Sequence, residues 1–296
     1  TRRLLVKENI MNIKDLEAKV TNQVIASLEA GVPPWHQQWV KDGSTNALLM
    51  SHHNGETGHT YTGINWLITQ FSEYQSNDWY TKRGAIKATG LDRPIPTEEF
   101  RKGTEIVYFK PVSKEVGCLT KNDNEKERYC IRKTYTIWNR EQIIGLPDVE
   151  PDESMDGFDP HTEIEEMLQN LDLKGGVSLG GDRACYIPSK DAICLPKDSA
   201  FTDENEREST KAHEGIHATG AKHRLDRNKP SYAYEELVAE LGAAMVCASL
   251  GVPLDKLQHT SYIQSWLKHL KDDTSFVFKA AADASKAVKY LTREVA

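Results

Sequence analysis

The sequence HEGIH at residues 213–217 constrains this chain more than any other feature. Two histidines four residues apart lie on one face of an α-helix, so His213 and His217 can bind a single metal ion together. A divalent ion such as zinc lowers the pKa of a bound water to about 7, and Glu214 is placed to act on that water as a general base. We therefore expect a buried helix that carries a metal centre.

A second helix, predicted over residues 234–250, supplies the third metal ligand. Glu236 follows His217 by 19 residues, close to the spacing at which gluzincin peptidases place a glutamate ligand. Glu240 lies four residues further on the same helix face, and we expect it to accept a hydrogen bond from a metal-binding histidine. The alternative exchanges the roles of these two glutamates. Glu235 is rotated by about 100° from Glu236, which indicates a solvated charge.

The ends of the motif helix also have local signals. Ser209 and Thr210 are candidate N-caps, and Gly220 is a candidate stop. His223, just beyond that stop, is either a further polar contact of the metal site or an exposed loop histidine.

The composition excludes several protein classes. Hydrophobic residues make up 39% of the 296 residues and charged residues 27%, which is typical of a folded globular protein. No run of about 18 apolar residues predicts a membrane span, and no apolar signal segment is recognisable. Five cysteines, an odd number without a CxxC pair, favour reduced thiols in the cytoplasm over a disulfide framework.

The charge changes sign along the chain. Residues 1–147 contain 20 basic and 17 acidic residues, whereas residues 148–296 contain 17 basic and 27 acidic residues. The change occurs at a Pro- and Gly-containing acidic stretch, so we predict a first domain at 1–147, a linker at 148–162 and a second domain at 163–296. Each domain is long enough to bury a core of its own.

Hydrophobic periodicity predicts an α+β fold in both domains. The spacing is helical over 12–31, 64–74, 161–171 and 276–295, and strand-like over 103–112, 127–138, 183–189 and 192–196.

The first domain has aromatic and basic residues that could bind single-stranded nucleic acid. A basic groove with aromatic platforms on which bases stack is the usual arrangement. The candidates are Trp35, Trp39, Trp79, Tyr80, Lys82, Arg83 and Lys110, and Tyr108 and Phe109 precede the last of them. Core packing is the alternative interpretation of the aromatic residues, since the net charge of this half is small.

Several motifs together resemble the ArdC antirestriction proteins of conjugative plasmids. In the first half these are PPWHQQW (33–39), YTGINWL (61–67), WYTKRGAIKATG (79–90), KGTEIVYFKP (102–111) and YTIWNREQIIGLP (135–147). In the second half they are RACYIPSKDAICLP (183–196), TKAHEGIHATGAKHRLDR (210–227) and YAYEELVAELGAAM (232–245).

The resemblance implies an N-terminal single-stranded-DNA-binding domain, shared with TraC-type plasmid primases, and a C-terminal zincin-like metallopeptidase domain. It implies protection of incoming plasmid DNA from host restriction, in the cytoplasm of the donor or recipient bacterium. The implied cofactor is zinc or another divalent metal such as manganese. The implied partners are single-stranded DNA and a host restriction enzyme or other DNA-bound protein.

The motif departs from the common family pattern, HELxH followed by Trp-Thr-Gly-His. This chain has Gly215 inside the motif, Ala218 in place of the tryptophan and Ala221 in place of the last histidine.

The leading hypothesis is a peptidase that its own DNA-binding domain tethers to single-stranded DNA. Two alternatives to this DNA-tethered peptidase stay open. One is a non-catalytic protein that coats single-stranded DNA or occludes the restriction enzyme, and in which the metal is structural. The other is a metal-dependent nuclease, which fits less well because nucleases favour clustered carboxylates with two metals.

Overall fold

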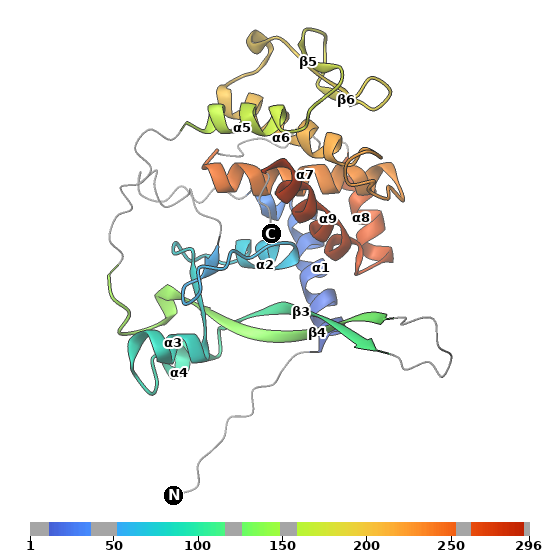
Figure 1. The fold of residues 1–296 in the computed structure, drawn as a ribbon. Helices are drawn as coiled ribbons and strands as arrows, with labels where there is room; N and C mark the ends of the chain where they lie inside the picture. Colours follow the sequence, from blue (N-terminus) through green and yellow to red (C-terminus); the bar gives the residue numbers. More distant parts are fainter. Residues whose placement is uncertain (1–11, 37–51, 116–125, 149–158, 253–261, 293–296) are drawn as a thin grey trace, which may run out of the picture.

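The computed structural model describes residues 12–36, 52–115, 126–148, 159–252 and 262–292, which form a mixed α+β structure (Figure 1). The N-terminal part contains α1 (Ile13–Glu29), η1 (Pro34–His36), β1 (His53–Asn54), α2 (Ile64–Gln70), β2 (Asp78–Thr81), α3 (Lys82–Thr89), α4 (Thr97–Phe100), β3 (Thr104–Glu115), β4 (Lys126–Asn139) and η3 (Arg140–Gln142).

The N-terminal strands form one sheet in the order β1-β2-β4-β3. Strands β1 and β2 are parallel, and the other two pairs are antiparallel. Strand β2 pairs with residues 137–139 of β4, whereas β3 pairs along its whole length with residues 126–137 of β4. The outer parts of β3 and β4 therefore form a long two-stranded ribbon, which crosses the lower part of Figure 1.

The C-terminal part carries the predicted metal motif. It contains α5 (Pro160–Gln169), β5 (Gly176–Leu179), β6 (Cys185–Ile187), β7 (Ala192–Leu195), η5 (Asp198–Ala200), α6 (Glu204–Thr219), α7 (Tyr232–Leu250), α8 (Ile263–Asp272) and α9 (Phe276–Leu291). Its small sheet has the order β5-β7-β6, with β5 parallel and β6 antiparallel to β7.

One hydrophobic core continues from the N-terminal helices into the C-terminal helices. Helix α1 contacts both α8 and strand β4 of the ribbon (Figure 1). Trp35 contacts Trp266 edge-to-face, with the ring centroids 5.9 Å apart. The backbone N–H of Gly63 also donates to Ser285 Oγ across 2.5 Å. In the described residues the two parts therefore share one core, although each is long enough to bury a core of its own. The boundaries at 147 and 162 stay predictions, because residues 149–158 lie outside the described part.

The motif helix begins earlier than its sequence signals suggest. Helix α6 starts at Glu204, and the side chain of Asp203 caps it by accepting from the Glu206 N–H. The prediction of Ser209 or Thr210 as N-cap is wrong: both hydroxyls donate to the Glu206 carbonyl oxygen inside the helix. Gly220 is the C-cap, as expected. No helix in the described ranges has the length and apolar character needed to cross a membrane.

Candidate metal centre

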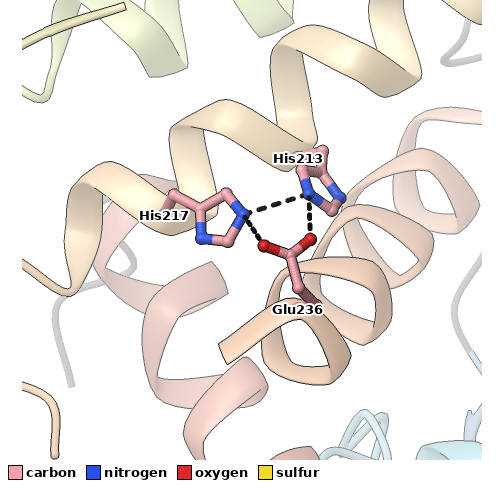
Figure 2. A group of neighbouring side chains, drawn as sticks. All are labelled: His213, His217 and Glu236. Carbon is pink, nitrogen blue, oxygen red and sulfur yellow. Dashed lines mark hydrogen bonds and ion pairs between the residues drawn. The ribbon is translucent and has the colours of Figure 1, made fainter. Parts of the chain in front are cut away.

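The metal motif lies where α6 packs against α7, and α7 is buried along nearly its whole length. His213 and His217 come from consecutive turns of α6, and Glu236 comes from the first turns of α7 (Figure 2). The three side chains point toward one another, and one ligand atom from each lies within 4.8 Å of the others. The structure thus brings together the three ligands that the sequence predicted.

The distances within this group fit a single divalent ion. The Nε2 atoms of His213 and His217 are 3.1 Å apart, and each lies 3.6 Å from an oxygen of Glu236. Ligand atoms in a tetrahedral zinc site lie roughly 3.3–3.5 Å apart, as bond lengths near 2.0–2.1 Å require. Two imidazole nitrogens and one carboxylate are also the donor set of catalytic sites with an open fourth position.

Two further glutamates orient the histidine rings. Glu240 Oε2 lies 3.5 Å from His213 Nδ1, and Glu235 Oε1 lies 3.2 Å from His217 Nδ1. A carboxylate at Nδ1 favours the tautomer that leaves the Nε2 lone pair for a metal. This geometry favours Glu236 over Glu240 as the candidate third ligand, with Glu240 on the other side of the His213 ring.

The expectation that Glu235 is a solvated charge is wrong. Glu235 is 5% exposed, and its carboxylate accepts two hydrogen bonds from Arg227, at 2.6 and 3.0 Å. Lys229 Nζ lies 3.3 Å from Glu235 Oε1. Burial alone raises the pKa of this carboxyl, but the hydrogen bonds from His217 and Arg227 lower the pKa to about 2. Glu235 is consequently ionised whenever the protein is folded near neutral pH.

The field at the site favours a cation. Burial alone would lower the pKa of His213, yet the carboxylates of Glu236 and Glu240 raise this pKa to about 10. Glu236 itself has a lowered pKa, because hydrogen bonding to His213 and the charge of His217 outweigh its burial. Such a cluster stabilises positive charge between the ligands, which a divalent ion supplies.

Glu214 lies beside the ligands on the wall of a cavity of about 560 Å³. Its Oε2 accepts a hydrogen bond of 2.6 Å from the backbone N–H of Tyr186 in β6. His213, His217 and Glu236 line the same cavity. The predicted base and the predicted ligands therefore face one space, of a size typical for bound ligands.

Two tyrosines at this cavity were not predicted. Tyr232 begins α7, four residues before Glu236 and on the same face, and its side chain hydrogen-bonds Glu236. Its hydroxyl lies 2.7 Å from that of Tyr262. Burial and these two neighbours raise the pKa of Tyr232, so its phenol stays a neutral donor at working pH. The spacing of four from Glu236 was the available sequence signal.

His223 does not join the metal ligands. Its Nε2 lies 3.1 Å from Asp191 Oδ2, in a cluster centred on the buried pair of Asp191 and Arg224. Arg224 also donates to the carbonyl oxygens of Leu171 and Ala218. This cluster connects the turn after β6 to the end of α6. It therefore stabilises the elements around the metal site without including a candidate ligand.

The structure buries three of the predicted DNA-binding aromatic residues. Trp35, Trp79 and Tyr80 are at most 4% exposed, and their rings pack in the hydrophobic cores. A buried ring cannot stack on a base, which corrects the choice of aromatic side chains. Lys82 and Arg83 are exposed on α3. Trp39 and the side chain of Lys110 lie outside the described part.

The ribbon exposes three other aromatic rings, two of which were candidates from the sequence. Tyr108, Phe109 and Tyr135 are 49%, 48% and 45% exposed. Tyr108 and Tyr135 contact each other edge-to-face, with the ring centroids 5.6 Å apart. The exposed Lys133 pairs with Tyr108 across the two strands. Tyr108 and Phe109 are among the candidates from the sequence, whereas Tyr135 is not.

Comparison with protein families matches both parts of the chain. Residues 14–138 match the N-terminal domain of anti-restriction factor ArdC, and residues 162–283 match a zincin-like metallopeptidase family. The metal-free crystal structure of antirestriction protein ArdC from plasmid R388 is 33% identical, with a TM-score of 0.70 over 94% of this chain and 96% of that one. The chain belongs to the ArdC antirestriction family.

The Mn(II)-bound crystal structure of R388 ArdC is 32% identical, with a TM-score of 0.68 over 94% of this chain and 97% of that one. Together with the His-His-Glu cluster, it supports a divalent metal here.

Curated relatives extend the comparison. An uncharacterised protein of Sinorhizobium fredii is 29% identical over 94% of this chain and 91% of its own length. Two Escherichia coli proteins described as DNA primase TraC are 33% and 32% identical over 96% and 92% of this chain. This chain spans only 20% and 26% of those two primases.

Gly215, where the chain departs from the family motif, faces away from the candidate metal ligands. A methyl group built at Gly215 would lie 3.0 Å from Leu168 and 3.5 Å from Leu291. The departure therefore concerns the packing of α6 against α5 and α9, and the ligand positions on its other face are intact.

Proposed function

We propose that this chain binds single-stranded DNA and hydrolyses peptide bonds in proteins associated with that DNA, which protects incoming plasmid DNA from host restriction. The observation that supports catalysis most strongly is the position of Glu214. It lines one cavity with the three metal ligands, and a backbone N–H holds its carboxylate in place.

Each residue of the centre has a role in this proposal. His213, His217 and Glu236 hold zinc or another divalent ion such as manganese, which polarises the scissile carbonyl and acidifies water. The Glu214 carboxylate takes a proton from the attacking water and returns it to the leaving amine. Tyr232, at the cavity wall, donates a hydrogen bond from its neutral phenol to the Glu236 carboxylate.

Single-stranded DNA is the proposed partner of the ribbon. Tyr108 and Tyr135 offer two partly exposed rings on one face of the ribbon, and Lys133 supplies positive charge opposite Tyr108 on that face. Phe109 exposes a further ring on the other face. Stacking on aromatic rings beside basic side chains is sequence-tolerant, as a protein that meets any incoming strand requires. The acidic C-terminal half repels DNA, so binding maps to the ribbon side and weakens with salt.

Tethering of the peptidase to DNA explains why DNA binding and peptide hydrolysis are in one chain. A peptidase held on the strand meets proteins bound to the same strand at a high effective concentration. A restriction enzyme or another DNA-bound host protein is the proposed substrate. The test is to mix full-length protein, divalent metal and a DNA-binding target, with and without single-stranded DNA. We expect cleavage that depends on both metal and DNA; uncleaved target under all conditions contradicts the peptidase proposal.

A further inference from the structure

Two cysteines next to the metal cavity face each other across neighbouring strands. Cys185 in β6 pairs directly with Cys194 in β7, and the two thiols are within hydrogen-bonding contact. Directly opposed residues of antiparallel strands have Cα atoms roughly 4.5–5.5 Å apart. A disulfide spans Cα separations of roughly 4.4–6.8 Å, so the pair can close without moving the backbone.

The surroundings of this pair differ from those of a core cysteine. Cys185 and Cys194 are partly exposed, and Cys185 lines the cavity. Cys247, in contrast, is fully buried in α7. Packing accounts for Cys247, but it does not account for two opposed thiols within reach of solvent. All three are free thiols in this structure.

We propose that Cys185 and Cys194 form a dithiol site, which a small-molecule disulfide such as oxidised glutathione converts into an intramolecular disulfide. One thiolate attacks a sulfur of the oxidant and releases one reduced glutathione. The second protein thiolate then attacks the mixed disulfide, forms the Cys185–Cys194 bond and releases the second glutathione. Two protein thiols are oxidised, one disulfide is reduced, and the two protons pass to the departing thiolates.

The proposed Cys185–Cys194 disulfide lies close to the candidate base, Glu214. Tyr186 follows Cys185 directly, and its N–H donates to Glu214. A bond from Cys185 to β7 fastens the strand that holds this carboxylate. This consequence for catalysis rests on the proposed function, whereas the covalent chemistry does not. An exposed link of this kind is readily reduced, so the site reports the thiol–disulfide balance of the cell.

Peptide mapping of the full-length protein tests the proposal. Burial, Cys194 and Glu214 raise the pKa of the Cys185 thiol, so the incubation with oxidised glutathione is run at mildly alkaline pH. Free thiols are then alkylated and the protein is cut with trypsin. Lys190 lies between the two cysteines, so cleavage separates peptide 184–190 from peptide 191–197 unless a disulfide joins them.

We expect the joined peptides from the wild type and from Cys247→Ala, and their release on treatment with dithiothreitol. Cys185→Ser and Cys194→Ser should give no joined product and instead a glutathione adduct on the remaining thiol. The oxidised wild type should also unfold at a higher temperature than the reduced protein. Separate alkylated peptides from oxidised wild type, or a link to a different cysteine, overturn the proposal. This readout needs no peptidase activity, so it distinguishes failure of the dithiol site from failure of the proposed function.

Discussion

Gly242 of α7 lies directly against Ile216 of α6, so that a methyl group at position 242 would come within 2.8–3.0 Å of three Ile216 carbons. The absence of a side chain lets the two helices approach closely. Ile216 adjoins His217, and Gly242 is six residues from Glu236, so this contact sets the distance between the ligands of the two helices.

Gly242→Ala is expected to push the helices apart. Overpacking of a core contact costs about 1–3 kcal/mol, and the ligand geometry should loosen with it. Urea unfolding and Mn(II) titration measure the two effects. Ile216→Ala removes all three contacting carbons, so the double variant should bind metal more tightly than Gly242→Ala alone. Equal metal affinity in wild type and Gly242→Ala argues against this contact as the spacer.

Glu235 and Glu240 should each tighten metal binding through a histidine. Glu235→Gln and Glu240→Gln are expected to weaken Mn(II) or Zn(II) binding by about 10–100-fold, because the Nδ1 partner is lost. Competition with a chelating dye measures this affinity, and Glu204→Gln, on an exposed part of α6, is the control. Only Glu235→Gln also leaves the buried Arg227 without its carboxylate, so it should be the less stable variant. Wild-type affinity in Glu235→Gln would show that its contact with His217 is incidental.

Asp191 makes the stability of the C-terminal part dependent on pH. Burial alone would raise its pKa, but hydrogen bonds from Arg224, Tyr186 and the Lys174 N–H lower the pKa well below its usual value. The ionised form therefore stabilises the fold fully above the unfolded-state pKa of about 3.9, and this contribution is lost as the pH falls below it.

Asp191→Asn tests this contribution. Asp191 has a φ of 48°, a conformation that asparagine tolerates well, so the variant removes the charge without straining the backbone. Leaving Arg224 buried and unpaired should cost about 3 kcal/mol at pH 7. Urea unfolding from pH 3 to pH 7 should show the difference from wild type shrinking below about pH 4. A difference that stays constant across this range contradicts the assignment.

The exposed rings of the ribbon should carry single-strand binding. Tyr108→Ala and Tyr135→Ala are each expected to weaken binding of single-stranded DNA by about 1–3 kcal/mol, the usual value of one base-stacking contact. Lys133→Ala should reduce the salt dependence as well as the affinity. Fluorescence anisotropy at several salt concentrations measures both. Tyr290→Ala, on α9, is the matched control. Loss of affinity in the control equal to that in the ribbon variants places the site elsewhere.

The sequence was informative where the signal is local. The helical spacing of His213 and His217, and the position of Glu236 on the next helix, are short-range patterns that metal coordination requires. The alternation in β3 and β4 and the helical spacing of α1 are equally local. For these elements the residues that determine the structure are neighbours in the chain.

Contacts between distant residues account for what the sequence did not reveal. Trp35 is buried because it meets Trp266, more than two hundred residues later, and no periodicity indicates that partner. Glu235 is nearer in the chain to its partner Arg227, but that residue lies in the loop after α6, and helical spacing does not indicate the pair. The burial of Trp35 and the shared core follow from packing between the two parts of the chain, which composition treats as separate domains.

Comparison of the wild type with Glu214→Gln tests the central claim most directly. Glutamine keeps the shape of the side chain but cannot accept a proton. The variant should retain metal content and single-strand binding, lose peptide hydrolysis by about 10²–10⁴-fold, and lose protection of unmodified plasmid DNA entering a restricting host. Glu204→Gln should behave as wild type in all four measurements. Full protection by a metal-loaded Glu214→Gln protein would contradict the account, because the metal centre would then serve only as structure.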